Sequence, residues 1–284
     1  MAHAEIIDPA TEWVRQYEFV LRQSGLDRHK VVCNALSESE NSPSAMADRS
    51  QHEGLFSLAD CLAKPSLLIN QVRRDYMDAE GPAMIRARIS VLQQDLALSV
   101  IAPLTLRLFR DQKTAIPDPN SIFLAPLPAH KALDITQPRW FQIPGGELLN
   151  ATDYQRVLGK MTSDWYPIFR HQMGLSPGAY WSSVGLGLGA PFSAVWNLAE
   201  PNALCALAQR WLEAFSCSAA AFIDWIPAVF GDQATAIPQR KGCCLKYLLP
   251  DGGYCGTCGV HRKHRLSSLK AQNQPAQGRS PTEH

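Results

Sequence analysis

Apolar residues recur every three or four positions along much of the chain, and this spacing predicts a fold dominated by helices. The first stripe follows Asp8-Pro9, a pair typical of a helix start, and it stops before Gly25, a typical helix end. Pro65 predicts a break between two short helices in the region that follows. A longer stripe begins at Gly81-Pro82, and we expect Pro103 to kink or end that helix.

The pattern changes between residues 111 and 146, where six prolines bracket two short β-like runs, 121–124 and 139–143. These runs predict a small sheet or a hairpin. Helical spacing returns afterwards: Asn150 is expected to cap a helix that ends near Pro167, and another helix is expected over 204–215. The predicted fold class is therefore α+β, dominated by helices, with a small central β segment.

This pattern divides the chain into four regions. Residues 1–110 form an N-terminal helical region, and 111–238 combine the β segment with more helices and are the expected substrate region. Residues 239–265 form a cysteine-rich C-terminal segment. Residues 37–53 are polar and rich in helix breakers, which predicts a loop or a disordered insertion, and 266–284 have little apolar content, which predicts a disordered tail.

Composition narrows the class of protein. The 284 residues are 46% hydrophobic and 19% charged with a net charge of +1, which is typical of a globular protein and lacks the basic excess of a nucleic-acid binder. The longest apolar run, 96–106, is too short to span a bilayer, so we expect at most transient contact with the inner face of a membrane. The first nine residues lack the basic start and apolar core of an export signal, which favours the cytoplasm.

Half of the eight cysteines lie within sixteen residues, in the pattern C-C-x10-C-x2-C formed by Cys243, Cys244, Cys255 and Cys258. Such a cluster indicates disulfides, a structural zinc ion or an iron–sulfur centre. Disulfides fit a cytoplasmic chain of this length poorly, because it can bury a core without covalent links.

Zinc and iron–sulfur both remain open from the spacing. Cys255-x2-Cys258 is an ordinary zinc knuckle, but zinc sites normally pair it with a second spaced pair. Adjacent side chains in an extended segment point to opposite sides, so Cys243 and Cys244 suit a wider centre with two metal atoms better than a single ion. His261 follows closely, and we interpret it as part of a solvated basic tail.

The remaining motifs are less specific. The other four cysteines, Cys33, Cys61, Cys205 and Cys217, lie outside any ligand pattern and are expected to be structural. The run from Gly185 to Ala190 fits G-x-G-x-x-A formally, and 180–184 could pass as the strand before it, but Pro191 follows at once and the sequence shows no second βαβ unit of a dinucleotide site. We interpret it as a flexible loop between two helices.

Two groups of residues are candidates for contacts with other molecules. Basic residues crowd the cysteine motif and are expected to stabilise an added electron and to dock an acidic electron donor: Arg240, Lys241, Lys246, Arg262 and Lys263. Aromatic and basic residues in the second half are candidates for contact with an organic iron chelate, although tryptophans are mostly core residues: Trp165, Arg170, His171 and Trp181.

The cysteine pattern resembles the C-terminal signature of the FhuF-type ferric-siderophore reductases. This resemblance implies a [2Fe–2S] cluster ligated by Cys243, Cys244, Cys255 and Cys258. It also implies a cytoplasmic oxidoreductase of iron assimilation that reduces ferric siderophores, with hydroxamate chelates as the substrate class and no catalytic residue beyond the cluster. The electrons would come from a donor protein or a diffusible reductant. The alternatives are a zinc-stabilised binding module and an iron–sulfur redox sensor.

Overall fold

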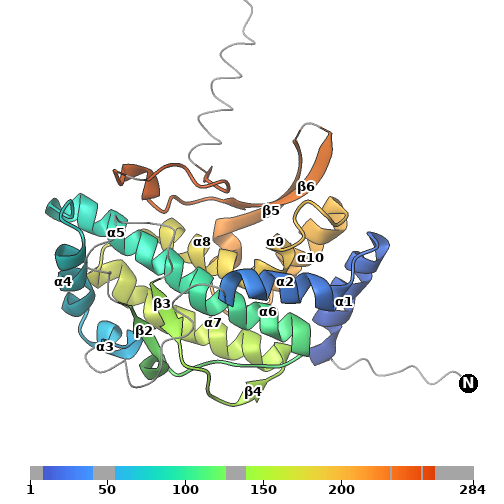
Figure 1. Ribbon diagram of the computed structural model, residues 1–284, viewed down its shortest axis with the longest axis horizontal. Helices are drawn as coiled ribbons and strands as arrows, with labels where there is room; N and C mark the ends of the chain where they lie inside the picture. The colour runs from blue at the N-terminus through green and yellow to red at the C-terminus, as the bar shows by residue number, and fades with distance from the viewer. Residues whose placement is uncertain (1–8, 41–54, 126–138, 231, 251, 260–284) are drawn as a thin grey trace, which may run out of the picture.

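A computed structural model describes residues 9–40, 55–125, 139–230, 232–250 and 252–259. A helix of 31 residues, Gly81–Asp111, crosses the middle of the fold (Figure 1). It consists of α5 (Gly81–Leu96), a π-helical turn η3 (Ala97–Ile101) and α6 (Ala102–Asp111). The wider π turn lies directly before Pro103, whose ring has no N–H and would clash with the preceding turn of an ordinary α-helix. The helix therefore continues through the proline at which we expected it to kink or end.

This helix is long and apolar enough to cross a membrane, but 72% of its most apolar window is buried inside the fold. It packs against α2 (Arg28–Glu40), α4 (Ser66–Asp75), α8 (Pro177–Leu188) and α9 (Ala190–Ser193), so burial accounts for its apolar character. The other helices of the described residues are α1 (Pro9–Gln23), α3 (Leu58–Ala63), α7 (Ala151–Pro167), the π-helical turn η5 (Ile168–Gln172), α10 (Pro201–Glu213) and α11 (Ala219–Phe222).

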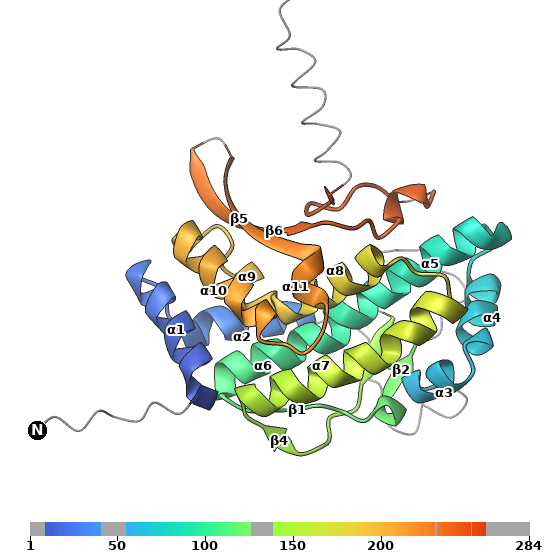
Figure 2. The same cartoon turned by 180° about the vertical axis from the view of Figure 1, so that it is seen from behind.

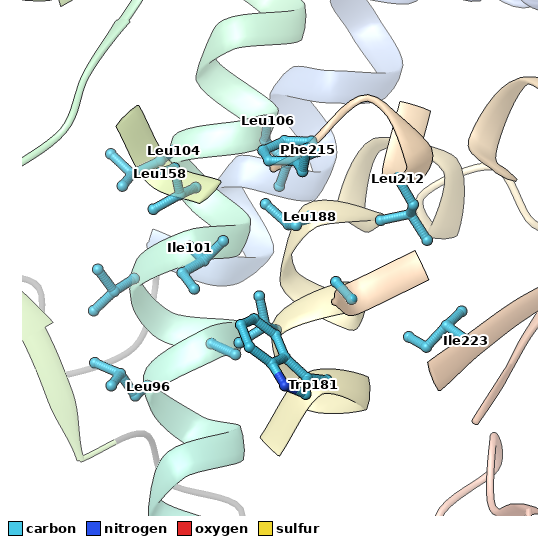
Figure 3. Packing of buried hydrophobic residues seen from close by; sticks show 14 of the residues in the cluster. Leu96, Ile101, Leu104, Leu106, Leu158, Trp181, Leu188, Leu212, Phe215 and Ile223 are labelled. Carbon is cyan, nitrogen blue, oxygen red and sulfur yellow. The ribbon is translucent and has the colours of Figure 1, made fainter. Parts of the chain in front are cut away.

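One cluster of buried residues extends from Tyr17 to Ala236 and joins both halves of the chain. Figure 3 shows side chains of α5, α6, α7, α8 and α10 meeting in it. At one end, the Phe109 ring packs edge-on against the rings of Tyr17 and Trp211, with centroids 5.1 and 5.0 Å apart. Because these helices share one core, their positions relative to one another are fixed, and segments that pack on them are held in place.

The described strands form three antiparallel pairs. The two predicted β runs pair as β2 (Ile122–Leu124) with β3 (Trp140–Gln142), which confirms the small central sheet. A short pair, β1 (Thr114–Ala115) with β4 (Leu148–Leu149), lies beside it in sequence. The third pair, β5 (Ile223–Phe230) with β6 (Gln233–Arg240), is a hairpin that the apolar pattern did not predict. Figures 1 and 2 show that this hairpin leads into a C-terminal segment that lies over α5 and α8.

Two local predictions are wrong. The glycine run at 185–189 lies mostly inside α8, where a Cβ at Gly187 would clash with the carbonyl oxygen of Ala97, so the glycine permits close helix packing and no loop exists there. The polar stretch predicted as a loop begins inside α2, which continues to Glu40, and its residues 41–53 lie outside the described ranges.

The fold class is confirmed, since 61% of the structure is helical and only a few short strands accompany the helices. The predicted functional division into four regions stays a prediction, and the predicted disordered tail lies outside the described residues.

Candidate metal centre

The C-terminal segment is attached to the core where β6 ends. Gly242 lies against Gly178 in the first turn of α8, so closely that a Cβ on Gly242 would overlap the Gly178 backbone. The Lys241 N–H also donates to the carbonyl oxygen of Phe222, at 2.9 Å. These contacts fix the backbone just before Cys243 and Cys244.

A turn after the adjacent cysteines directs backbone N–H groups toward sulfur. Leu245 has a φ of 61°, a left-handed conformation that costs a residue with a side chain about 1–2 kcal/mol. In this conformation the Leu245 N–H donates to Cys243 Sγ at 3.3 Å. The N–H of Lys246 donates to Cys244 in the same way. The short helix η6 (Lys246–Leu248) then follows and contacts α5.

The second pair of cysteines returns along the end of β6. The Arg240 N–H donates to the Thr257 carbonyl at 3.1 Å, and the Cys258 N–H closes a turn on the Cys255 carbonyl at 3.0 Å. Gly259 passes so close to the Arg240 carbonyl oxygen that a Cβ would overlap it. The backbone therefore brings 255–258 next to 243–244 although ten residues separate the two pairs.

All four thiols are close enough to interact with one another. The Cys255 thiol donates a hydrogen bond to Cys244, which lowers the pKa of Cys244 to about 5 and raises the pKa of Cys255 well above its ordinary value. Burial raises the pKa of Cys243, whose sulfur also interacts with Cys244 and Cys258. Within the described ranges, no three His, Cys, Asp or Glu side chains converge on one point as a single metal ion would require.

A buried positive charge lies beside these thiols. Arg240 is 1% exposed, and its guanidinium donates to Ser182 Oγ at 2.9 Å, Gln94 Oε1 at 2.7 Å and Ser183 Oγ at 3.0 Å. All of these acceptors are neutral, and no carboxylate of the described chain forms an ion pair with it. Its charge favours the thiolate form of Cys243, Cys244 and Cys255.

This arrangement fits an anionic metal–thiolate group. A buried cation normally has a counter-charge, because removing an unpaired charge from water is costly. Two ferric ions, two sulfides and four thiolates sum to a charge of −2, which would provide that counter-charge. Three features therefore agree with a [2Fe–2S] cluster held by Cys243, Cys244, Cys255 and Cys258. They are the four thiol ligands, the two N–H···S hydrogen bonds and the buried cation.

The other cysteines differ in their surroundings. Cys61 and Cys205 are buried in the helical core, and burial raises the pKa of Cys61 to about 12 and that of Cys205 to about 11. Burial also raises the pKa of Cys217, and Cys33 lies half-buried on α2. Each of these thiols lies in or beside a helix, and such cysteines commonly serve as small apolar side chains, which agrees with a structural role.

The residues predicted to dock an electron donor have different positions. The prediction is wrong for Arg240, because a residue that is 1% exposed cannot contact a partner protein. Lys241 is exposed and forms an ion pair with Asp224 at 2.8 Å, and Lys246 is half-buried in η6. Arg262 and Lys263 lie outside the described residues. Docking by Lys241 and Lys246 stays a prediction.

The four residues predicted to contact a chelate do not lie together on one surface. The prediction is wrong for Trp165 and Trp181, which are both 4% exposed and belong to the core. Arg170 is exposed and donates to the Leu175 carbonyl at 3.2 Å. His171 lines a pocket of about 400 Å³ between α4, α5 and η5.

The residues that hold Arg240 were missed by sequence reasoning. Ser182 and Ser183 are buried on α8 and Gln94 is half-buried on α5, all far from the cysteines in sequence. Two adjacent serines in an otherwise apolar helix were the only signal, and serines of this kind usually bond to their own helix backbone. Both do so here as well, to Gly178 and Ala179.

Comparison with known proteins agrees with this chemistry. Neither the curated proteins nor the solved structures contain a significant match to the chain. A family model does match, over residues 240–258, which include Arg240 and all four cysteines of the motif. Residues 240–258 thus match the FhuF 2Fe-2S C-terminal domain, and this match points to a [2Fe–2S] cluster as the cofactor of the protein.

Proposed function

We propose that this protein is a cytoplasmic one-electron reductase that releases iron from ferric siderophores, most favourably from hydroxamate chelates. The observation that carries the proposal is the match of residues 240–258 to the FhuF 2Fe-2S C-terminal domain, on a segment in which a buried cation acts on three of the four thiols. When bound, the cluster supplies a centre that accepts and donates single electrons.

The chain's own residues support this use in two ways. Cys243 and Cys255 are half-buried whereas Cys244 and Cys258 are buried, so one side of the thiol set lies near the surface. The N–H groups of Leu245 and Lys246 and the charge of Arg240 all stabilise additional negative charge on the sulfurs. A centre at this depth can exchange electrons with molecules that touch the surface.

The substrate logic follows from ligand hardness. Hydroxamate oxygens are hard donors that bind Fe(III) far more tightly than Fe(II). One electron from a donor protein or a diffusible reductant converts chelated Fe(III) to Fe(II), and the weakened complex then dissociates into Fe(II) and the free chelator. Only the iron–oxygen bonds of the chelate break, and no covalent bond of the chelator does. The chain therefore needs no catalytic acid or base.

An exposed aromatic surface next to the thiols supports contact with a redox partner. The rings of Tyr247 and Tyr254 stack with centroids 5.4 Å apart and planes 15° from parallel, and they are 41% and 48% exposed. Leu248 beside them is 42% exposed, and Lys246 adds positive charge. Exposed apolar groups rimmed by charge are typical of surfaces that bind transiently.

The test combines metal analysis with rapid kinetics on anaerobically purified full-length protein. We expect two irons and two acid-labile sulfides per chain, an EPR signal that appears on reduction, and loss of that signal when ferric hydroxamate is mixed in. Cys244→Ser is expected to lose the colour and the reaction, whereas Cys33→Ser, the matched control, keeps both. A colourless protein with one zinc ion would contradict the proposal in favour of a binding module. A coloured protein whose reduced form ferric chelates do not oxidise would favour a sensor.

A further inference from the structure

The pocket that contains His171 has the composition of an anion-binding site. It has a volume of about 400 Å³, within the range of small-molecule sites. Its basic side chains come from three elements: Arg73 on α4, Arg86 on α5 and His171 on η5. Its apolar wall is formed by side chains that include Ile69, Ile85 and Met173.

The two arginines are not neutralised by the protein. Within the described chain neither Arg73 nor Arg86 forms an ion pair, and the nearby acid Asp78 is paired with Arg88 at 2.6 Å. Arg73 donates to the neutral Asn70 side chain at 3.4 Å, a long contact that leaves most of its N–H groups for a ligand. Arginine binds carboxylates through two parallel hydrogen bonds, which gives it preference for that group over a neutral one.

The backbone also shapes this pocket. Gly174 has a φ of 76°, and the Arg86 side chain packs over it, since a Cβ there would lie 3.5 Å from Nε. Without a side chain at 174, Arg86 lies along the pocket wall beside Gln172 and Met173. The carbonyl of Leu175 accepts from Arg170 and so helps to hold the turn that follows His171.

The position of this pocket relates it to the metal centre. α5 contributes Ile85, Arg86 and Ile89 to the pocket, and the same helix contacts η6 in the C-terminal segment. Figures 1 and 2 both show that segment lying over α5, with α4 at the same end of the fold. A molecule in the pocket would lie beside the helix on which the cluster segment rests.

We propose that the pocket lined by Arg73, Arg86 and His171 binds the ferric chelate, and that it selects chelates that carry free carboxylate groups. This inference rests on the proposed function and narrows its substrate class to anionic hydroxamate complexes. The guanidinium groups contact the carboxylates, His171 adds a ring nitrogen for a further hydrogen bond, and the isoleucines contact the carbon skeleton of the chelator.

The test measures binding separately from electron transfer. Gallium(III) has the charge and nearly the size of Fe(III) but does not accept one electron under these conditions, so gallium complexes bind without turnover. The probes are the gallium complex of a citrate-centred dihydroxamate, which carries carboxylates, and that of a neutral cyclic trihydroxamate. Calorimetry with the cluster-loaded full chain is expected to give at least tenfold tighter binding of the first complex.

Arg73→Gln and Arg86→Gln are each expected to weaken binding of the carboxylate-bearing complex about tenfold, which equals 1.4 kcal/mol, and to leave the neutral complex unchanged. Arg74→Gln is the matched control, because Arg74 is the next residue on α4, is exposed as Arg73 is, and does not line the pocket. Equal binding of the two complexes, or wild-type affinity in both pocket variants, overturns the proposal.

The same variants distinguish this proposal from the function on which it rests. If the gallium complex binds in the pocket but ferric chelates never oxidise the reduced cluster, the reductase function fails and the binding site stands. If ferric chelates oxidise the cluster at wild-type rates and concentrations in Arg73→Gln and Arg86→Gln, the function stands and the pocket proposal is overturned.

Discussion

Replacing Arg240 tests the link between the core and the metal centre. Arg240→Met removes the buried charge and keeps a flexible side chain of similar length, while Arg240→Lys keeps the charge and loses the planar fork. The wild-type guanidinium donates to four acceptors on α5 and α8, the fourth being the Ala179 carbonyl at 3.4 Å. We expect the methionine variant to lower the reduction potential of the centre.

The size of the change follows from Coulomb's law. At an effective dielectric constant of about 20 and a separation of about 8 Å, a unit cation stabilises one added electron by roughly 2 kcal/mol. For a one-electron couple, this free energy corresponds to roughly 90 mV. Arg240→Lys is expected to recover much of that difference, since the charge remains although the hydrogen bonds to both serines are not reproduced.

The assay is a potentiometric titration of the full chain followed by EPR. Lys241→Met is the matched control: Lys241 is the next residue, but it is exposed and paired with Asp224, so solvent screens its charge. We expect its variant to change the potential by less than about 20 mV, because exposed charges interact weakly through water. Equal potentials in Arg240→Met and the wild type would refute the role of the buried cation.

Two further predictions concern the packing of the segment and a buried acid. Gly242→Ala forces a Cβ into the Gly178 backbone, so we expect the C-terminal segment to pack on α8 less favourably by about 1–3 kcal/mol and the purified protein to contain less iron. Gly256→Ala is the control, because its Cβ would meet open space, and we expect it to keep its iron. Burial raises the pKa of Asp95, so its contribution to stability is greatest below the ordinary value of 3.8 and is lost as pH rises toward the raised value. Across that window the folded protein binds one more proton than the unfolded chain. Asp95→Asn should therefore gain free energy of unfolding relative to wild type as the pH rises from about 4, by about 1.4 kcal/mol for each pH unit in the window; urea unfolding that shows a constant difference would contradict this.

Much of the helical framework was predictable because its signals are local. The break at Pro65, the long helix from Gly81 and the cap at Asn150 each depend on residues within a few positions, and the structure has α3 and α4 on either side of that break and Asn150 accepting from the Asp153 N–H at 3.0 Å. The cysteine motif was visible for the same reason. Its four cysteines lie within sixteen residues, so the spacing narrows their role to disulfides, a zinc site or an iron–sulfur centre.

The β5–β6 hairpin was missed because two prolines interrupt its strands. Pro227 and Pro238 normally argue against a strand, since proline has no N–H to donate to a neighbour. In a two-stranded hairpin each strand has one edge that does not pair with the other strand, so a proline nitrogen can face that edge without loss of a ladder hydrogen bond. The register places Trp225 opposite Pro238 and Pro227 opposite Ala236, which no local pattern reveals.

The environment of Arg240 could not be read from sequence for a different reason. In the sequence, Arg240 looks like the other basic residues near the cysteines. Its burial becomes apparent only from the groups that accept its hydrogen bonds. Those partners lie 146 residues away for Gln94 and 58 for Ser182, on helices whose apolar spacing gives no sign of a buried charge. Pairing of this kind depends on the three-dimensional packing of α5 and α8 against the end of β6.

These contacts also connect cofactor binding with the fold. In the absence of the cluster, Arg240 keeps a buried positive charge that, among the described residues, the low-pKa thiol of Cys244 offsets. Binding of a dianionic cluster supplies the missing counter-charge, so the stability of the segment and the affinity for the cofactor must rise together. Arg240 donates hydrogen bonds to groups on α5 and α8, and both helices belong to the core. The coupling between cluster binding and stability therefore extends beyond the C-terminal segment. We therefore expect the cluster to raise the unfolding temperature of the whole chain, and Arg240→Met to reduce that rise; calorimetry on cluster-loaded and cluster-free protein that shows equal unfolding temperatures would contradict the coupling.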